Sequence, residues 1–135
     1  MAQILVVDDS LMMRRTIRRI LEQSGHTVVA ESGNGEQAIL DYEQHQPDLV
    51  TLDITMPGLN GIETLKRIIS SHPQAVIIMV SALGQNRMIF EAMQAGAKNY
   101  IMKPIGDEKL LSVIDLVLES SKCTDIAGGQ RGIIF

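Results

Sequence analysis

The chain of 135 residues is long enough for one domain with a single core, and we expect no second catalytic or DNA-binding module. Hydrophobic residues make up 45% and charged residues 21%, which excludes a disordered chain, and the formal net charge of -4 argues against nucleic acid or an anionic membrane as the main partner. Cys123 is the only cysteine, which excludes an intramolecular disulfide, and no apolar run reaches the roughly 18 residues of a membrane span.

Five short apolar segments, rich in β-branched residues, predict five strands whose starts lie 24, 21, 27 and 24 residues apart. They cover residues 3–7, 27–31, 48–52, 75–80 and 99–102. The first helix is the clearest, because its apolar residues recur at i, i+4, i+7 and i+8 between a Ser10 N-cap and a Gly25 stop. Its other face carries arginines that we expect to be solvated: Arg14, Arg15, Arg18 and Arg19. Later helices are expected over residues 36–44, 62–71, 85–95 and 107–119.

Strand and helix alternate five times along the chain. This pattern predicts an α/β fold with a parallel sheet, right-handed crossovers and helices on both faces of the sheet. Ligands of such open sheets bind beyond the carboxyl ends of the strands, near the point where the strand order reverses. Functional residues are therefore expected directly after the strands.

Polar residues follow four of the five predicted strands. Asp8 and Asp9 follow the first strand, Asp53 the third, Ser81 the fourth and Lys103 the fifth. Three crowded carboxylates repel one another, so they either raise one another's pKa or bind a cation, and oxygen ligands alone favour Mg²⁺. The ammonium and the hydroxyl group add donors for a tetrahedral anion. The combination predicts phosphoryl chemistry with a carboxylate nucleophile.

Four motifs carry a resemblance to a known family: ILVVDDS, LVTLDITMPGLNGIE, IIMVSALG and AGAKNYIMKPI. In this order and spacing they resemble the receiver domain of two-component response regulators over about residues 3–119, with the single-domain chemotaxis regulators most similar. The resemblance implies a flavodoxin-like (βα)5 fold with a five-stranded parallel sheet in the order 2-1-3-4-5. We expect a receiver domain over residues 1–120 and a flexible tail over residues 121–135. The alternative is that the apolar end of the tail (Ile133, Ile134 and Phe135) docks on this or another molecule.

The resemblance also implies the roles of the acidic residues. Asp53 would be the phosphoacceptor. Asp9, Asp53 and the backbone carbonyl of Thr55 would bind Mg²⁺, and Asp8 would act through a metal-bound water.

The same resemblance implies a switch. Lys103 would pair with phosphoryl oxygens, Ser81 would be the switch hydroxyl and Tyr100 the switch aromatic. The bond between Lys103 and Pro104 would be cis, which proline makes tolerable. The output surface would comprise the fourth helix, the fifth strand and the fifth helix, and Met88 and Met93 on the fourth helix would add adaptable side chains to it.

Two further positions are expected to set the lifetime of the phosphoryl group. In the family, the side chains two residues beyond Asp53 and two beyond Ser81 point toward the approach of the hydrolytic water; here they are Thr55 and Leu83. Neither carries a carboxylate or an amide that could orient water, and we expect Leu83 to shield the approach. Slow spontaneous dephosphorylation is therefore expected.

The implied partners are proteins. The donor would be a CheA-like sensor histidine kinase, the target the flagellar motor switch or another effector protein, and a phosphatase would end the signal. A phosphorelay intermediate or another stand-alone receiver is an open alternative. We expect a cytoplasmic phosphoacceptor rather than a conventional enzyme, with no membrane insertion.

Two enzyme hypotheses are weaker. Residues 33–38 (GNGEQA) match the G-x-G-x-x-G/A pattern of dinucleotide binding, but they follow the second strand rather than the first. A phosphatase with Asp53 as nucleophile, like the haloacid-dehalogenase-like enzymes, would carry a second Asp two residues later, where this chain has Thr55.

Overall fold

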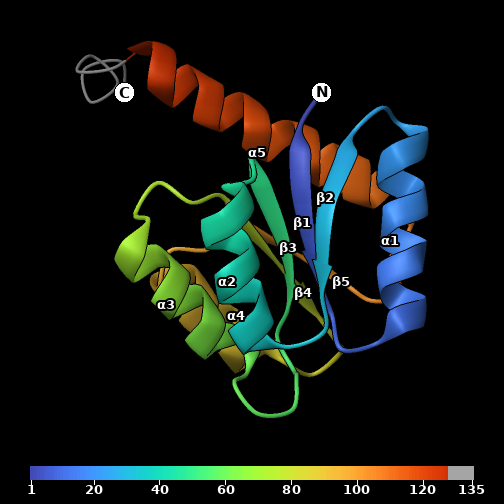
Figure 1. Ribbon diagram of the computed structural model, residues 1–135, viewed down its shortest axis with the longest axis vertical. Coiled ribbons are helices and arrows are strands. Elements are labelled where there is room, and N and C mark those ends of the chain that lie inside the picture. The colour runs from blue at the N-terminus through green and yellow to red at the C-terminus, as the bar shows by residue number, and fades with distance from the viewer. Residues whose placement is uncertain (128–135) are drawn as a thin grey trace.

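The computed structural model of the protein describes the backbone of residues 1–127 and the side chains of residues 1–120. Five parallel strands form one sheet in the order β2-β1-β3-β4-β5, as expected for the flavodoxin-like fold (Figure 1). The strands are β1 (Gln3–Val7), β2 (Thr27–Ser32), β3 (Leu49–Asp53), β4 (Ile77–Ser81) and β5 (Asn99–Met102). The helices are α1 (Leu11–Gln23), α2 (Gly35–His45), α3 (Gly61–Ser71), α4 (Asn86–Gln94) and α5 (Asp107–Ala127).

Helices cover both faces of the sheet, and a separate apolar cluster lies on each face. On one side, α1 and α5 bury residues such as Ile20 and Ile114 against the sheet. On the other side, α2, α3 and α4 bury residues such as Tyr42, Leu65 and Ala92. Figure 1 shows the two layers, with α2 and α3 on one side of the strands and α1 on the other. The three inner strands, β1, β3 and β4, are buried on both faces almost throughout, so a ligand can reach them only at the edge formed by their ends.

The first three helices begin at side-chain caps, as the sequence predicts for Ser10. The side chains of Ser10, Asn34 and Asn60 each accept a hydrogen bond from the backbone N–H three residues later. Such a cap satisfies one of the N–H groups that a helix leaves free at its start. The predicted strands and helices are all present, with boundaries that differ by up to two residues except at the end of α5.

The end of α5 differs from the prediction. The sequence analysis ends this helix at residue 119, whereas the structure continues it to Ala127. Residues 120–127 contain neither glycine nor proline, so nothing interrupts the backbone hydrogen bonds before Gly128. The expected tail therefore begins as helix, and its apolar end lies outside the described residues.

Two further features bear on earlier expectations. The peptide bond between Lys103 and Pro104 is cis, as the resemblance implies. Among residues 1–127, no helix is both long and apolar enough to cross a membrane.

Candidate functional site

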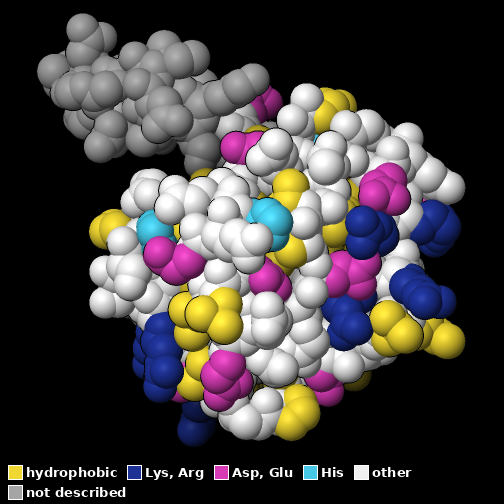
Figure 2. Space-filling model, in the orientation of Figure 1, with side chains coloured by type: hydrophobic (Ala, Val, Ile, Leu, Met, Phe, Trp, Pro, Cys, Tyr) yellow, Lys and Arg dark blue, Asp and Glu magenta, His cyan; other side chains and the backbone are white. Residues whose placement is uncertain are grey.

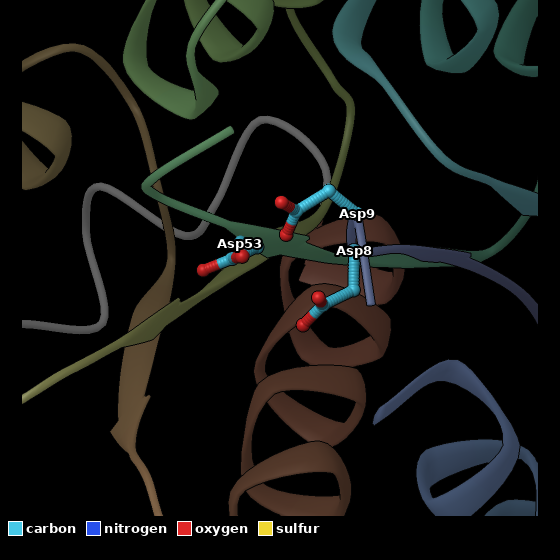
Figure 3. Close-up of side chains that lie close together, drawn as sticks. All are labelled: Asp8, Asp9 and Asp53. Carbon is cyan, nitrogen blue, oxygen red and sulfur yellow. The ribbon is translucent and has the colours of Figure 1, made fainter. Parts of the chain in front are cut away.

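Three carboxylates meet at the carboxyl edge of the sheet. Asp8 and Asp9 follow the last residue of β1, and Asp53 is the last residue of the neighbouring β3. One oxygen from each lies within 4.8 Å of the others, and Figure 3 shows the three side chains gathered at the ends of their strands. This edge between β1 and β3 is where the strand order reverses, which is the expected ligand position.

Strand register brings the remaining polar residues to the same edge. Asp53 pairs with Val80, so Ser81 lies one residue beyond it, and Ser81 in turn pairs with Met102, directly before Lys103. The Lys103 Nζ atom lies 3.5 Å from Asp8 Oδ2 and 3.6 Å from Asp53 Oδ1. Four separate strand ends thus supply one site, as the sequence predicts.

The ammonium of Lys103 only partly compensates the buried acids. Asp8 is 1% and Asp53 4% exposed, whereas Asp9 faces solvent. Burial, reinforced by the charge of Asp8, raises the pKa of Asp53 to about 6, against the lowering effects of Lys103 and of a hydrogen bond from the Thr55 N–H. Asp53 therefore carries a charge near neutral pH that the surrounding protein stabilises poorly. A bound cation would relieve this cost.

Two buried polar atoms of the site lack hydrogen-bond partners among the described residues. They are Asp8 Oδ2 and the Ser81 hydroxyl, and Ser81 is fully buried. The other Asp8 oxygen accepts from the Ser10 N–H at 2.9 Å. Because buried polar groups are almost always paired, unpaired ones at a functional edge point to a ligand. An all-oxygen acidic set, in which Asp8 Oδ2 has only the Lys103 ammonium 3.5 Å away as a partner, fits a hard cation such as Mg²⁺.

Close backbone packing holds Asp53 in place. Gly61, at the start of α3, donates its N–H to the Ile54 carbonyl at 2.8 Å. A Cβ atom at this glycine would lie 2.1 Å from the Asp53 carbonyl oxygen and 2.7 Å from Ile54 Cα. Only glycine allows α3 to approach the end of β3 so closely.

One residue of the predicted solvated face supports the site instead. Arg14 donates to the Asp8 carbonyl at 2.6 Å and to Glu31 at 3.2 Å. Arg18 also pairs with Glu31, and these partners lower the pKa of Glu31 despite its burial. The expectation of a fully solvated arginine face is therefore wrong for Arg14, because Glu31 on β2 lies beside α1. Sequence periodicity alone did not show this tertiary partner.

The two predicted lifetime positions differ in their surroundings. Leu83 is 87% exposed, so in this structure its side chain does not cover Asp53. Thr55 is also exposed, but its hydroxyl accepts a hydrogen bond from the side-chain amide of Gln85 at 2.5 Å. The sequence analysis missed Gln85, since no local pattern links residues 30 positions apart.

Tyr100 lies on the surface of the protein. It is 40% exposed on β5, and the neighbouring helix α4 exposes Phe90 (66%) and Met93 (38%). This group of exposed large side chains lies on the surface that the resemblance implies for output. We refer to Phe90, Met93 and Tyr100 as the α4–β5 surface.

The glycine pattern that suggested dinucleotide binding has a packing explanation. The segment follows β2, which is an edge strand away from the reversal point. A Cβ atom at Gly35 would lie 2.2 Å from the Thr64 hydroxyl and 2.7 Å from the Leu59 carbonyl. Gly35 therefore lets the start of α2 approach α3 closely. This packing explains the glycine without a role in binding a pyrophosphate.

Comparison with known proteins agrees with this geometry. Residues 4–115 match the response regulator receiver domain. The chain is 50% identical over 116 residues to the chemotaxis protein CheY of Bacillus subtilis, covering 86% of this chain and 97% of that protein. It is 44% identical over 118 residues to protein CcdB of the same organism, covering 87% of this chain and 98% of that protein.

A solved structure is similar as well. It is the CheX–CheY–BeF3–Mg²⁺ complex from Borrelia burgdorferi, with a TM-score of 0.82 and 35% identity, covering 85% of this chain and 87% of that chain. The fold, the strand-end residues and these matches agree. The chain belongs to the response regulator receiver domain family.

Proposed function

We propose that the protein is a stand-alone chemotaxis regulator that accepts a phosphoryl group on Asp53 from a CheA-like histidine kinase. A carboxylate oxygen of Asp53 attacks phosphorus, the bond between phosphorus and the kinase's imidazole nitrogen breaks, and an acyl phosphate forms on Asp53. The observation that carries the proposal is the placement of Asp53 beside Asp8, Asp9 and Lys103 at the reversal point of the sheet. With a pKa of about 6, Asp53 is mostly ionised at neutral pH and can act as the nucleophile.

Residues already present at the site would do the remaining work. Asp8, Asp9, Asp53 and the Thr55 carbonyl would hold Mg²⁺, which supplies positive charge that offsets the negative charge accumulating during transfer. The Lys103 ammonium is close enough to pair with an added phosphoryl oxygen. The buried Ser81 hydroxyl has no hydrogen-bond partner among the described residues, so it could donate to another phosphoryl oxygen.

The output would be a change at the α4–β5 surface. Movement of Ser81 toward the phosphoryl oxygens would open space that Tyr100 can fill. This would shift the balance between two conformations of the surface. The exposed large side chains there support binding to another protein, such as the flagellar motor switch. Tyr100 should then change its rotamer distribution when beryllofluoride and Mg²⁺ are added.

A second surface supports docking of the kinase. Leu11, Met12, Arg15 and Arg19 line a shallow pocket on α1, and Met12 is 78% exposed. Figure 2 shows dark-blue basic side chains gathered where Figure 1 places α1, with hydrophobic side chains beside them. This helix begins two residues after Asp9, so an acidic partner bound there would lie close to Asp53.

Phosphorylation by a small donor tests the proposal directly. Acetyl phosphate with Mg²⁺ should add one phosphoryl group to the protein, and mass spectrometry should locate it on Asp53. Asp53→Asn and excess EDTA should each abolish the addition, whereas the exposed Asp115→Asn should behave as the parent. Undiminished labelling in EDTA or in Asp53→Asn would overturn the assignment.

A second candidate is a stand-alone receiver or phosphorelay carrier outside chemotaxis, since the similar protein CcdB is not named as a chemotaxis protein. Phosphotransfer profiling of purified histidine kinases against this protein separates the two candidates by the kinase that reacts fastest. The complex of CheX with CheY supports a phosphatase partner. We also propose that the protein is located in the cytoplasm.

A further inference from the structure

The start of α4 differs from that of the three preceding helices. α1, α2 and α3 are capped by the side chains of Ser10, Asn34 and Asn60. Gln85 occupies the same position before α4, but its side chain makes no hydrogen bond to its own helix. Among the side chains of residues 1–120, none accepts a hydrogen bond from the free N–H groups in the first turn of α4, so the position of this helix end depends on contacts outside the helix.

The Gln85 side chain instead joins two loops. Its Oε1 atom accepts from the Ala82 N–H at 2.6 Å, and its Nε2 atom donates to the Thr55 hydroxyl oxygen at 2.5 Å. A backbone N–H can only donate, so the amide atom facing Ala82 must be the oxygen, which leaves the nitrogen for Thr55. Hydrogen-bond chemistry thus settles the orientation of the amide.

Both partners of this amide lie close to residues of the Asp53 site in the sequence. Thr55 lies two residues after Asp53, and its backbone N–H lowers the pKa of the Asp53 carboxyl group. Ala82 directly follows Ser81, whose buried hydroxyl lacks a partner. A single side chain therefore connects the residue that contacts Asp53, the residue next to Ser81 and the beginning of α4.

We infer that Gln85 is a positioning residue that couples the Asp53 site to the start of α4. When modification of Asp53 displaces Thr55 or Ala82, the amide transmits the displacement to the N-terminus of this helix. The same helix, α4, exposes Phe90 and Met93 of the α4–β5 surface. The functional meaning of this coupling rests on the proposed function, but the link itself exists in the unmodified protein and can be measured there.

Hydrogen exchange of the unphosphorylated, metal-free protein tests the link. The Ile89 N–H donates to the Gln85 carbonyl at 2.9 Å and reports on the first turn of α4. Gln85→Met keeps the side-chain length and helix propensity but removes both hydrogen bonds, so exchange at Ile89 should become about three- to tenfold faster. Thr55→Val removes one of the bonds from the other side and leaves the sequence of α4 unchanged. It should accelerate exchange in the same direction.

The double variant and a control complete this test. Gln85→Met combined with Thr55→Val should exchange no faster than Gln85→Met alone, because the same hydrogen bond is lost in both. Asn86→Ala, at an exposed neighbouring position, should leave Ile89 near the parent rate. Unchanged exchange in Gln85→Met, or effects that multiply in the double variant, would overturn the link. Thermal unfolding of Thr55→Val identifies any global loss of stability.

Beryllofluoride with Mg²⁺, which mimics the phosphoryl group, tests the coupling. In the parent protein, the backbone amide resonances of both Thr55 and Ile89 should shift on addition. In Gln85→Met, the Thr55 shift should persist, while the Ile89 shift should fall to half or less. An undiminished Ile89 response would contradict the coupling. If Thr55 does not respond in the parent, the proposed phosphoacceptor site fails, and the exchange experiment still decides the link.

Discussion

Asp53 is held in an ionised form that the metal-free fold stabilises poorly. Its pKa is about 6, against an ordinary value of 3.8, because burial and the neighbouring Asp8 disfavour its charge. Between about pH 4 and pH 6, Asp53 is therefore mostly protonated in the folded protein and mostly ionised in the unfolded chain. The contribution of Asp53 to stability is therefore highest below pH 4 and falls as the pH rises through about 6.

Neutralising this carboxylate should stabilise the metal-free protein. In EDTA at pH 7, Asp53→Asn is expected to raise the free energy of unfolding by as much as about 2–3 kcal/mol, and by less at pH 5. Urea unfolding at both pH values measures the difference, with Asp115→Asn as the exposed control. A gain that is equal at the two pH values would show that the charge of Asp53 is not its cause.

Lys103 is expected to act after phosphorylation more than before it. Its ammonium lies near two acids, so Lys103→Ala should leave Mg²⁺ binding intact or slightly stronger, because one competing positive charge is removed. The charge-assisted contact to a phosphoryl oxygen would be lost, so the resonances of Tyr100 should respond less to beryllofluoride. Calorimetry and NMR measure the two effects. A variant that loses metal binding but keeps the Tyr100 response would contradict this division of roles.

At the scale of elements, the packing of α3 against β3 depends on one glycine. A Cβ atom at Gly61 would meet backbone atoms of Asp53 and Ile54, which cannot move as a flexible side chain can. Gly61→Ala is therefore expected to cost about 3 kcal/mol of stability or more, and to displace Asp53. Gly106 precedes α5 with nothing within 4 Å of its virtual Cβ, so Gly106→Ala should cost at most about 1 kcal/mol. Chemical denaturation compares them, and equal losses would refute the packing argument.

At the scale of the whole molecule, the lifetime of the phosphoryl group depends on loops from separate strands. Thr55 and Leu83 offer no acidic or amide side chain to orient water, which predicts slow spontaneous dephosphorylation. The double change Thr55→Asn and Leu83→Glu should accelerate the first-order loss of phosphate in Mg²⁺. Decay no faster than that of the parent would show that these positions do not set the lifetime. Because Leu83 is exposed, the predicted slow dephosphorylation rests on the lack of a water-orienting side chain and not on shielding of Asp53 by Leu83.

The sequence determined most of the architecture because its signals are local. Alternating apolar segments and helical periodicity predict the five strands and five helices. Parallel strands bring their carboxyl ends to one edge, so the sequence alone assigns Asp8, Asp53, Ser81 and Lys103 to one site. Residue types alone then indicated phosphoryl chemistry.

Only the tertiary structure decided the features that depend on distant residues. Arg14 turns from the expected solvated face to the Asp8 carbonyl because Glu31 on β2 lies beside it. Gly61 and Gly35, which look like ordinary turn or motif glycines in the sequence, are required by close backbone approaches. The bridge from Gln85 to Thr55 depends on two loops that meet only when β3 and β4 pair. Local patterns cannot specify such contacts, since the partner of each residue is chosen by packing rather than by sequence spacing.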